Sequence, residues 1–108
     1  MAAILATIKR DSEGYLLTWT DWQPAVAIAI AAEEGLELTE DHWQIIAIMR
    51  KFYAEYHTSP TMRVLLKILA DKLAPEKINS IYLYQLFPAG PIKQANKIAG
   101  LLKPLRCI

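Results

Sequence analysis

The residue best suited to chemistry in this sequence is its single cysteine, Cys107, which stands one residue before the carboxyl terminus. The thiolate is the reactive form of cysteine, and the positive charges of Lys103 and Arg106 favour it, whereas the terminal carboxylate acts in the opposite sense. Because Pro104 stops any helix from carrying Cys107 back into the body, we expect the sulfur to be reachable. It is either a chemically active thiol or an incidental surface cysteine.

Little else in the composition indicates a reactive or metal-binding group. One cysteine excludes a disulfide framework, and the two histidines, His42 and His57, form no cluster at zinc spacing. His42 follows Asp41 near an expected helix start, where it can act as an acid or base, but packing is the favoured interpretation. We therefore expect no metal and no cofactor, and a reduced, cytoplasmic setting.

The charges are distributed unevenly along the chain, although the net charge is only +1. Residues 1–58 hold nine acids and four bases, about −5, and residues 59–108 hold eight bases and two acids, about +6. The basic half can face a nucleic acid, or it can steer toward an acidic partner and steady a thiolate. It is equally consistent with two halves that intermingle on folding.

The elements that must position Cys107 are expected to form one domain, because 108 residues suffice for a single core. Residues 3–8 and 15–20, joined by turn residues at 11–14, predict a β-hairpin that packs on the helices. The apolar start is short and runs into Lys9 and Arg10. We therefore expect neither a signal peptide nor a membrane span.

Five helices are expected after the hairpin, each from a start signal followed by apolar periodicity. The signals are Asp21 with Pro24, Thr39, Ser59 with Pro60, Asn79 with Ser80, and Pro91. The expected helices cover about 22–34, 40–56, 60–73, 81–86 and 91–99, the last ended by Gly100. The first is apolar on all sides, which favours a place at the centre of the core. The fold class is thus α+β and mostly helical, with a flexible C-terminal arm.

Arg63 and Lys67 are four residues apart in the third expected helix and so share one face. That face is either a solvated edge or a cationic strip on which the cysteine arm or an acidic partner docks.

A series of short motifs runs from residue 11 to the end of the sequence. The motifs are Asp11-x-Glu13-Gly14-Tyr15-Leu16, Asp21-Trp22, Glu34-Gly35-x-x-Leu38-Thr39, His42-Trp43, Phe52-Tyr53, Ser59-Pro60-x-x-Arg63-x-Leu65, residues 82–91, residues 94–101, and the ending Lys103-Pro104-x-x-Cys107-Ile108. Together they resemble the DsrC/TusE family of small sulfur-carrier proteins, in which the penultimate residue is a cysteine on a mobile arm. The first ten residues match poorly.

One departure indicates the branch. DsrC proteins of sulfur respiration resemble this chain but carry a second arm cysteine, with ten residues between it and the last cysteine, where this sequence has Asn96. The single cysteine is the pattern of the TusE branch. The resemblance then implies one domain, with residues 1–99 as the body and residues 100–108 as a mobile cysteine arm.

The function that the resemblance implies is that of a sulfurtransferase acting as a protein sulfur carrier. Cys107 would accept persulfide sulfur, with supporting roles for Arg106, Lys103, Arg63 and Lys67. The implied donor is a TusBCD-like relay complex. The implied acceptor is an MnmA-like tRNA thiouridylase, with or without bound tRNA, which makes 2-thiouridine at the wobble position.

Two other functions stay open at this point. The third and fourth helices can be interpreted as a helix-turn-helix that binds nucleic acid, with the basic half facing phosphate. Against this, the candidate recognition helix, residues 81–86, is mostly apolar and has no arginine. The third possibility is a structural adaptor in which Cys107 takes no part.

Overall fold

The structure, a computed structural model, describes residues 2–72 and 78–102. Within these ranges no helix is both long enough and apolar enough to cross a membrane. The elements in chain order are the 3₁₀ helices η1 (Ala2–Thr7) and η2 (Trp19–Asp21) and the α-helices α1 (Pro24–Glu33), α2 (Glu40–Tyr56), α3 (Met62–Ala70), α4 (Ser80–Leu86) and α5 (Pro91–Ile98).

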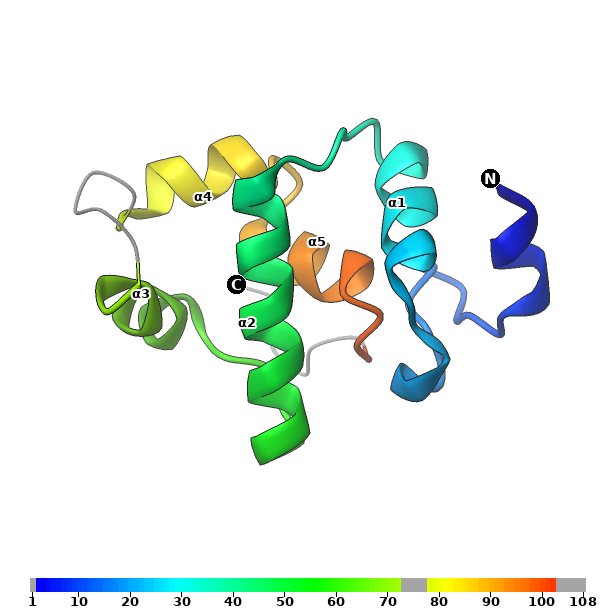
Figure 1. Cartoon of the computed structure of the whole chain (residues 1–108), viewed down its shortest axis with the longest axis horizontal. Helices are drawn as coiled ribbons and strands as arrows, with labels where there is room; N and C mark the ends of the chain where they lie inside the picture. The colour runs from blue at the N-terminus through cyan, green and yellow to red at the C-terminus, as the bar shows by residue number, and fades with distance from the viewer. Residues whose placement is uncertain (1, 73–77, 103–108) are drawn as a thin grey trace.

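The short helix α5 is the centre of the fold. It packs against α1, α2 and α4, and Figure 1 shows it between α2 and α1, with η1 on the outer side of α1. Most of its side chains are buried, including the polar Gln94 and Asn96. The expectation that the apolar helix α1 is central is therefore wrong in part: α1 buries Val26 and Ile30 completely but leaves Ile28 48% exposed.

The core is built from large apolar side chains of every α-helix and of the N-terminal segment. Because α5 is only 8 residues long, its neighbours supply most of this surface. The largest fully buried side chains are Leu16, Val26, Ile30, Ile45, Ile46, Met49, Leu65, Leu69, Leu83, Phe87, Ile98 and Leu101.

Three of the predicted helix starts, those at Thr39, Asn79 and Pro91, are confirmed, and two are displaced. Pro91 stands in the first turn of α5, as Pro24 does in α1, and the Asn79 side chain accepts a hydrogen bond from the backbone N–H of Tyr82 at 2.8 Å. Thr39 caps α2 in a reciprocal capping box with His42. Asp21, by contrast, lies in η2, and the residue before α1 is Gln23.

The third helix begins later than the sequence suggested. Its N-cap is Thr61, whose hydroxyl oxygen accepts from the N–H of Val64 at 3.2 Å, so Ser59 is not the cap. Ser59 instead accepts a hydrogen bond from Asn96 of α5, at 2.6 Å. A hydrogen bond to a distant helix has replaced the local cap that the Ser-Pro pair predicted.

The predicted N-terminal β-hairpin is wrong. The turn itself forms, with Asp11 Oδ1 accepting from the N–H groups of Glu13 and Tyr15, but among the described residues β-pairing is limited to one antiparallel bridge, Arg10 with Leu16. A half-buried strand must alternate, whereas Tyr15 and Leu16 are both buried. The partner segment coils into η1, which packs against α1.

Two isoleucines two residues apart on α1 test which side of that helix faces the core. Ile30→Ala should lower the free energy of unfolding by about 2–5 kcal/mol, because it empties a fully buried site. Ile28→Ala, at a 48% exposed site, should change it by less than about 1 kcal/mol. Urea denaturation measures both. Equal losses, or the reverse order, would show that α1 is oriented differently.

Candidate functional site: the root of the C-terminal arm

The residues predicted to do chemistry, Cys107, Lys103 and Arg106, lie outside the described residues, which end at Leu102. What the structure describes is the segment from which they continue. We call residues 98–102 the arm root. Leu101 is fully buried and Leu102 is 40% exposed, so the burial of the arm root ends between these two residues.

The arm root begins with a helix-ending motif that the sequence predicted through Gly100. Gly100 has a φ of 73°, the left-handed conformation that glycine adopts without strain. Its N–H donates to the carbonyl of Lys97 at 3.2 Å, and the N–H of Leu101 donates to the carbonyl of Asn96 at 3.0 Å. These are the two hydrogen bonds of a Schellman motif, which reverses the chain at the end of α5.

The next two carbonyls are held by side chains from distant parts of the chain. The indole Nε1–H of Trp22 donates to the carbonyl of Ile98 at 2.9 Å, and the Arg50 guanidinium donates to the carbonyl of Ala99 at 2.7 Å. The last carbonyls of a helix have no partner within the helix. Trp22 and Arg50 therefore complete the hydrogen bonding of this helix end, and we call the pair the arm-root clamp.

Arg50 is itself held between two aromatic rings. Its guanidinium carbon lies 4.3 Å from the ring centroid of Trp22 and 5.3 Å from that of Trp19, within the range of cation–π attraction. It also donates to the carbonyl of Trp19 at 3.3 Å. Burial lowers the pKa of Arg50, but an arginine stays charged throughout the physiological range. The cation faces the negative end of the α5 dipole, which stabilises it.

Gly100 is required at the arm root for its size as well as its conformation. A β-carbon at this position would overlap the Trp22 side chain. The ring of Trp22 therefore lies directly against the backbone at the point where the chain turns toward the arm.

Asn96, at the position where the sequence resemblance implies a second arm cysteine in sulfur-respiration proteins, is fully buried in α5. Its amide nitrogen donates to the Ser59 hydroxyl at 2.6 Å, whereas its Oδ1 has no hydrogen-bond partner in the described part of the chain. The side chain fixes α5 to the segment before α3. It presents no nucleophile.

The two candidate residues of α3 are exposed and lie apart from the nearest hollow. Arg63 and Lys67 are on the outer face of the helix. The hollow between α2 and α3, of about 340 Å³, is lined by Lys51, Glu55, Lys72 and apolar or aromatic side chains instead. Because the arm residues lie outside the described ranges, whether Arg63 and Lys67 meet them stays a prediction.

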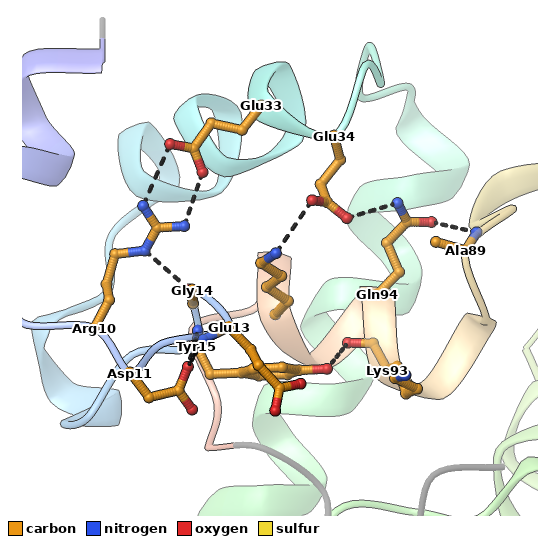
Figure 2. A network of polar contacts seen from close by, with 11 residues as sticks. Arg10, Asp11, Glu13, Gly14, Tyr15, Glu33, Glu34, Ala89, Lys93 and Gln94 are labelled. Carbon is orange, nitrogen blue, oxygen red and sulfur yellow. Dashed lines mark hydrogen bonds and ion pairs between the residues drawn. The ribbon is translucent and has the colours of Figure 1, made fainter.

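A second group of polar side chains, shown in Figure 2, ties the N-terminal turn and the end of α1 to α5. The guanidinium of Arg10 donates to both carboxylate oxygens of Glu33, at 2.8 and 3.3 Å, and to the carbonyl of Gly14 at 2.9 Å. This fork brings Arg10 so close to Gly14 that a β-carbon there would approach it to 2.8 Å. The ion pair lowers the pKa of Glu33, first through the Arg10 hydrogen bond.

The α5 side of this group is neutralised within the protein. Glu34 accepts from Lys97 and from Gln94, each at 3.1 Å, and Gln94 accepts from the N–H of Ala89 at 3.1 Å. The hydroxyl of Tyr15 donates to the carbonyl of Lys93 at 3.3 Å (Figure 2). A hollow of about 180 Å³ lies among these groups. The charges of Glu34 and Lys97 compensate each other in an ion pair. We therefore interpret this group as a set of structural contacts that hold α5 against the end of α1 and the N-terminal turn.

His42 has a structural role, as the packing interpretation predicted. Its Nδ1 accepts from the backbone N–H of Thr39 at 3.0 Å, so the ring proton is assigned to Nε2, which donates to the carbonyl of Leu86 at 2.8 Å. Both ring nitrogens are occupied, and the ring packs edge-on against Phe87 at 5.2 Å. The described residues contain no cluster of His, Cys, Asp or Glu able to hold a metal ion.

The family described as DsrC like protein matches residues 5–108. The chain belongs to the DsrC family. It is 56% identical over 101 residues to a protein of Salmonella typhimurium named Sulfurtransferase TusE, covering 94% of this chain and 93% of that one. It is 53% identical over 102 residues to the protein of the same name from Pectobacterium atrosepticum, covering 94% of each.

Solved structures of DsrC proteins share the fold. The NMR structure of DsrC from Allochromatium vinosum matches with a TM-score of 0.83 at 51% identity, over 94% of this chain and 90% of that one. The crystal structure of DsrC from Archaeoglobus fulgidus, described as the oxidized γ-subunit of dissimilatory sulfite reductase, matches with a TM-score of 0.85 at 39% identity, over 94% and 92%. The helix-turn-helix interpretation has no support among these relatives.

Sequence reasoning missed Arg50 and Trp22, although it noted Trp22 within a DsrC family motif. Arg50 gave one usable signal. It lies four residues after Ile46 and three before Tyr53, both buried, so helical spacing places it on the buried side of α2, where a charged side chain is uncommon. Nothing in the local sequence indicates that its partners are the carbonyls of α5, because that contact spans 49 residues.

The Arg10–Glu33 ion pair predicts a pH dependence with a definite sign. Because the folded-state pKa of Glu33 lies below its ordinary value of 4.5, the pair stabilises the fold above that pH and is lost as the pH falls through the folded pKa. Glu33→Gln should cost no more than about 1 kcal/mol at pH 7, since the carboxylate is partly exposed. In urea denaturation this difference from wild type should shrink below pH 4.5.

The matched control is Glu37→Gln, a change at an exposed glutamate of the loop between α1 and α2. Its free energy of unfolding should differ from that of wild type by less than that of Glu33→Gln at pH 7. A difference between Glu33→Gln and wild type that persists or grows in acid would contradict the assignment.

Proposed function

We propose that this DsrC-family protein is a sulfurtransferase that carries persulfide sulfur on Cys107 and passes it along a relay to tRNA 2-thiolation. The observation that carries the proposal is the identity of more than 50%, across almost the whole chain, to proteins named Sulfurtransferase TusE. The single cysteine at the penultimate position supplies the one atom that such a role requires.

The chemistry needs only this thiol and two partners. The Cys107 thiolate attacks the outer sulfur of a donor persulfide, and a new S–S bond forms at Cys107 as the donor S–S bond breaks. The electron pair of the broken bond leaves with the donor thiolate, which takes up a proton. The sum is R–SSH plus Cys107–SH giving R–SH plus Cys107–SSH, with no net oxidation. The same exchange with an acceptor thiol completes the transfer.

The supporting residues act through charge. Lys103 and Arg106 flank the thiol in sequence and favour its thiolate form. Arg63 and Lys67, exposed on α3, form a cationic strip for an acidic partner surface or for the arm. Mutating such rim charges changes association rates and salt dependence more than the chemistry itself.

We further propose the order of the relay. The donor is a TusBCD-like complex and the acceptor an MnmA-like thiouridylase, with or without bound tRNA, in a cytoplasmic setting. The names of the relatives support a place in a sulfur relay. We also propose one domain, residues 1–108, in which the arm follows α5. Hydrogen bonds to α5 and burial hold Gly100 and Leu101 against the body.

Replacing Cys107 separates the carrier from an adaptor. Cys107→Ser should abolish wobble 2-thiouridine in cells that depend on this protein, measured by the mobility of thiolated tRNA in an organomercury gel. The purified variant should keep the helical circular dichroism of wild type, because the change is at the second residue from the terminus.

The control is the double variant Ser12→Cys with Cys107→Ser, which keeps one cysteine but moves it to the exposed turn at residue 12. It should also be inactive, since the thiol must lie on the arm. Normal 2-thiouridine with Cys107→Ser would exclude the carrier role and leave the adaptor.

A further inference from the structure

We infer that Arg50 and Trp22 are positioning residues that fix where, and in which direction, the arm bearing Cys107 leaves the body. That this positioning serves sulfur transfer rests on the proposed carrier function. That Arg50 and Trp22 hold the arm root does not, because it follows from the described contacts of residues 98–102.

The first observation is that the hydrogen bonding of this helix end is complete. The carbonyls of Asn96 and Lys97 accept from the backbone of the Schellman motif, and those of Ile98 and Ala99 accept from the clamp. Helix ends ordinarily fray, and water satisfies their last carbonyls. Here side chains 76 and 49 residues away in sequence replace water. The last turn of α5 is therefore held by tertiary contacts.

The second observation is the unusual use of Arg50. A half-buried guanidinium normally pairs with a carboxylate, because desolvating the charge is costly. Among the described residues, both hydrogen bonds recorded for Arg50 go to backbone carbonyls, those of Ala99 and Trp19. Two tryptophan rings offset the lost hydration. A cation so placed fixes the backbone at the arm root, and it contributes no ion pair to the described fold.

The consequence for a tethered thiol is geometric. Cys107 lies five residues beyond Leu102, so its Cα can reach at most about 17 Å from that residue. If the clamp opened and α5 frayed back to Ile98, the tether would grow from five residues to nine. The effective concentration of a tethered group falls roughly as the −3/2 power of tether length, here about twofold to threefold. The exit direction would also be lost.

The test labels the only cysteine, Cys107, with a nitroxide and maps which body amide signals it broadens in two-dimensional NMR spectra. Trp22→Phe keeps an aromatic ring, smaller than the indole, but removes the indole N–H, and Arg50→Lys keeps the charge but loses the planar fork. In both variants the broadened region should spread to more of the body. The amides of Gly100 and Leu101 should exchange with solvent at least tenfold faster, an order-of-magnitude expectation for local opening.

Two matched controls carry the same substitutions elsewhere. Trp43→Phe changes another half-buried tryptophan, and Arg10→Lys changes another arginine that donates to a backbone carbonyl. Both should keep the wild-type broadening pattern and the slow exchange at Gly100 and Leu101. Unchanged broadening in Trp22→Phe and Arg50→Lys would overturn the inference.

The wild-type protein provides a measurement that needs no variant, should either substitution prevent folding. The amides of Gly100 and Leu101 and the Trp22 indole N–H should exchange more slowly than the amide of Leu102, since they are hydrogen-bonded at a buried site. Equal exchange at all four would show that the clamp does not hold the arm root.

A kinetic comparison separates positioning from chemistry. In Trp22→Phe and Arg50→Lys, the rate of Cys107 with the small disulfide DTNB should match wild type. Sulfur transfer to a protein acceptor should slow about twofold to threefold. Equal slowing of both reactions would contradict a positioning role. If Cys107 carries no sulfur at all, the carrier proposal fails, and the NMR measurements still decide whether the clamp positions the arm.

Discussion

The hydrogen bond from the Arg50 guanidinium to the carbonyl of Ala99, 2.7 Å long, joins the longest helix of the protein to the end of its central one. Around it, Trp22 caps the neighbouring carbonyl and stacks on the cation, and Gly100 leaves room for the ring. A side chain at residue 100 would displace Trp22. Loss of the Trp22 ring would remove the nearer of the two aromatic neighbours of the arginine and leave only Trp19.

Further side-chain hydrogen bonds hold the part of α5 that precedes the arm root. Glu34, at the end of α1, holds both Gln94 and Lys97, and Asn96 is tied to Ser59. The central helix is thus held by hydrogen bonds to α1, α2 and the segment before α3, in addition to its apolar packing. A small body of this kind suits a protein whose reactive atom lies on a tether, because precise docking then depends on how rigidly the tether is rooted.

Local signals in the sequence predicted the helices well. The caps at Thr39 and Asn79, the prolines that open α1 and α5 and the glycine that ends α5 act through neighbouring backbone, so they can be recognised without the fold. The hairpin and the Ser59 cap failed for the opposite reason. Residues 2–7 are drawn into a 3₁₀ helix by packing on α1, and Ser59 is taken by Asn96, and neither partner is visible in local sequence.

The candidate site shows the same difference between local signals and long-range contacts. The sequence predicts its nucleophile, because the single cysteine, its flanking bases and the family motifs are all local features. The clamp was not, because Arg50 and Trp22 meet α5 only after the chain has folded across 49 and 76 residues. Their residue types alone suggest an ordinary surface charge and an ordinary core aromatic.

Intact-protein mass spectrometry after incubation with a persulfide donor decides whether Cys107 carries sulfur. We expect the chain to gain the mass of one sulfur atom, peptide mapping to place that atom on Cys107, and dithiothreitol to remove it. An unchanged mass, from a donor that loads a control persulfide acceptor under the same conditions, would contradict this expectation.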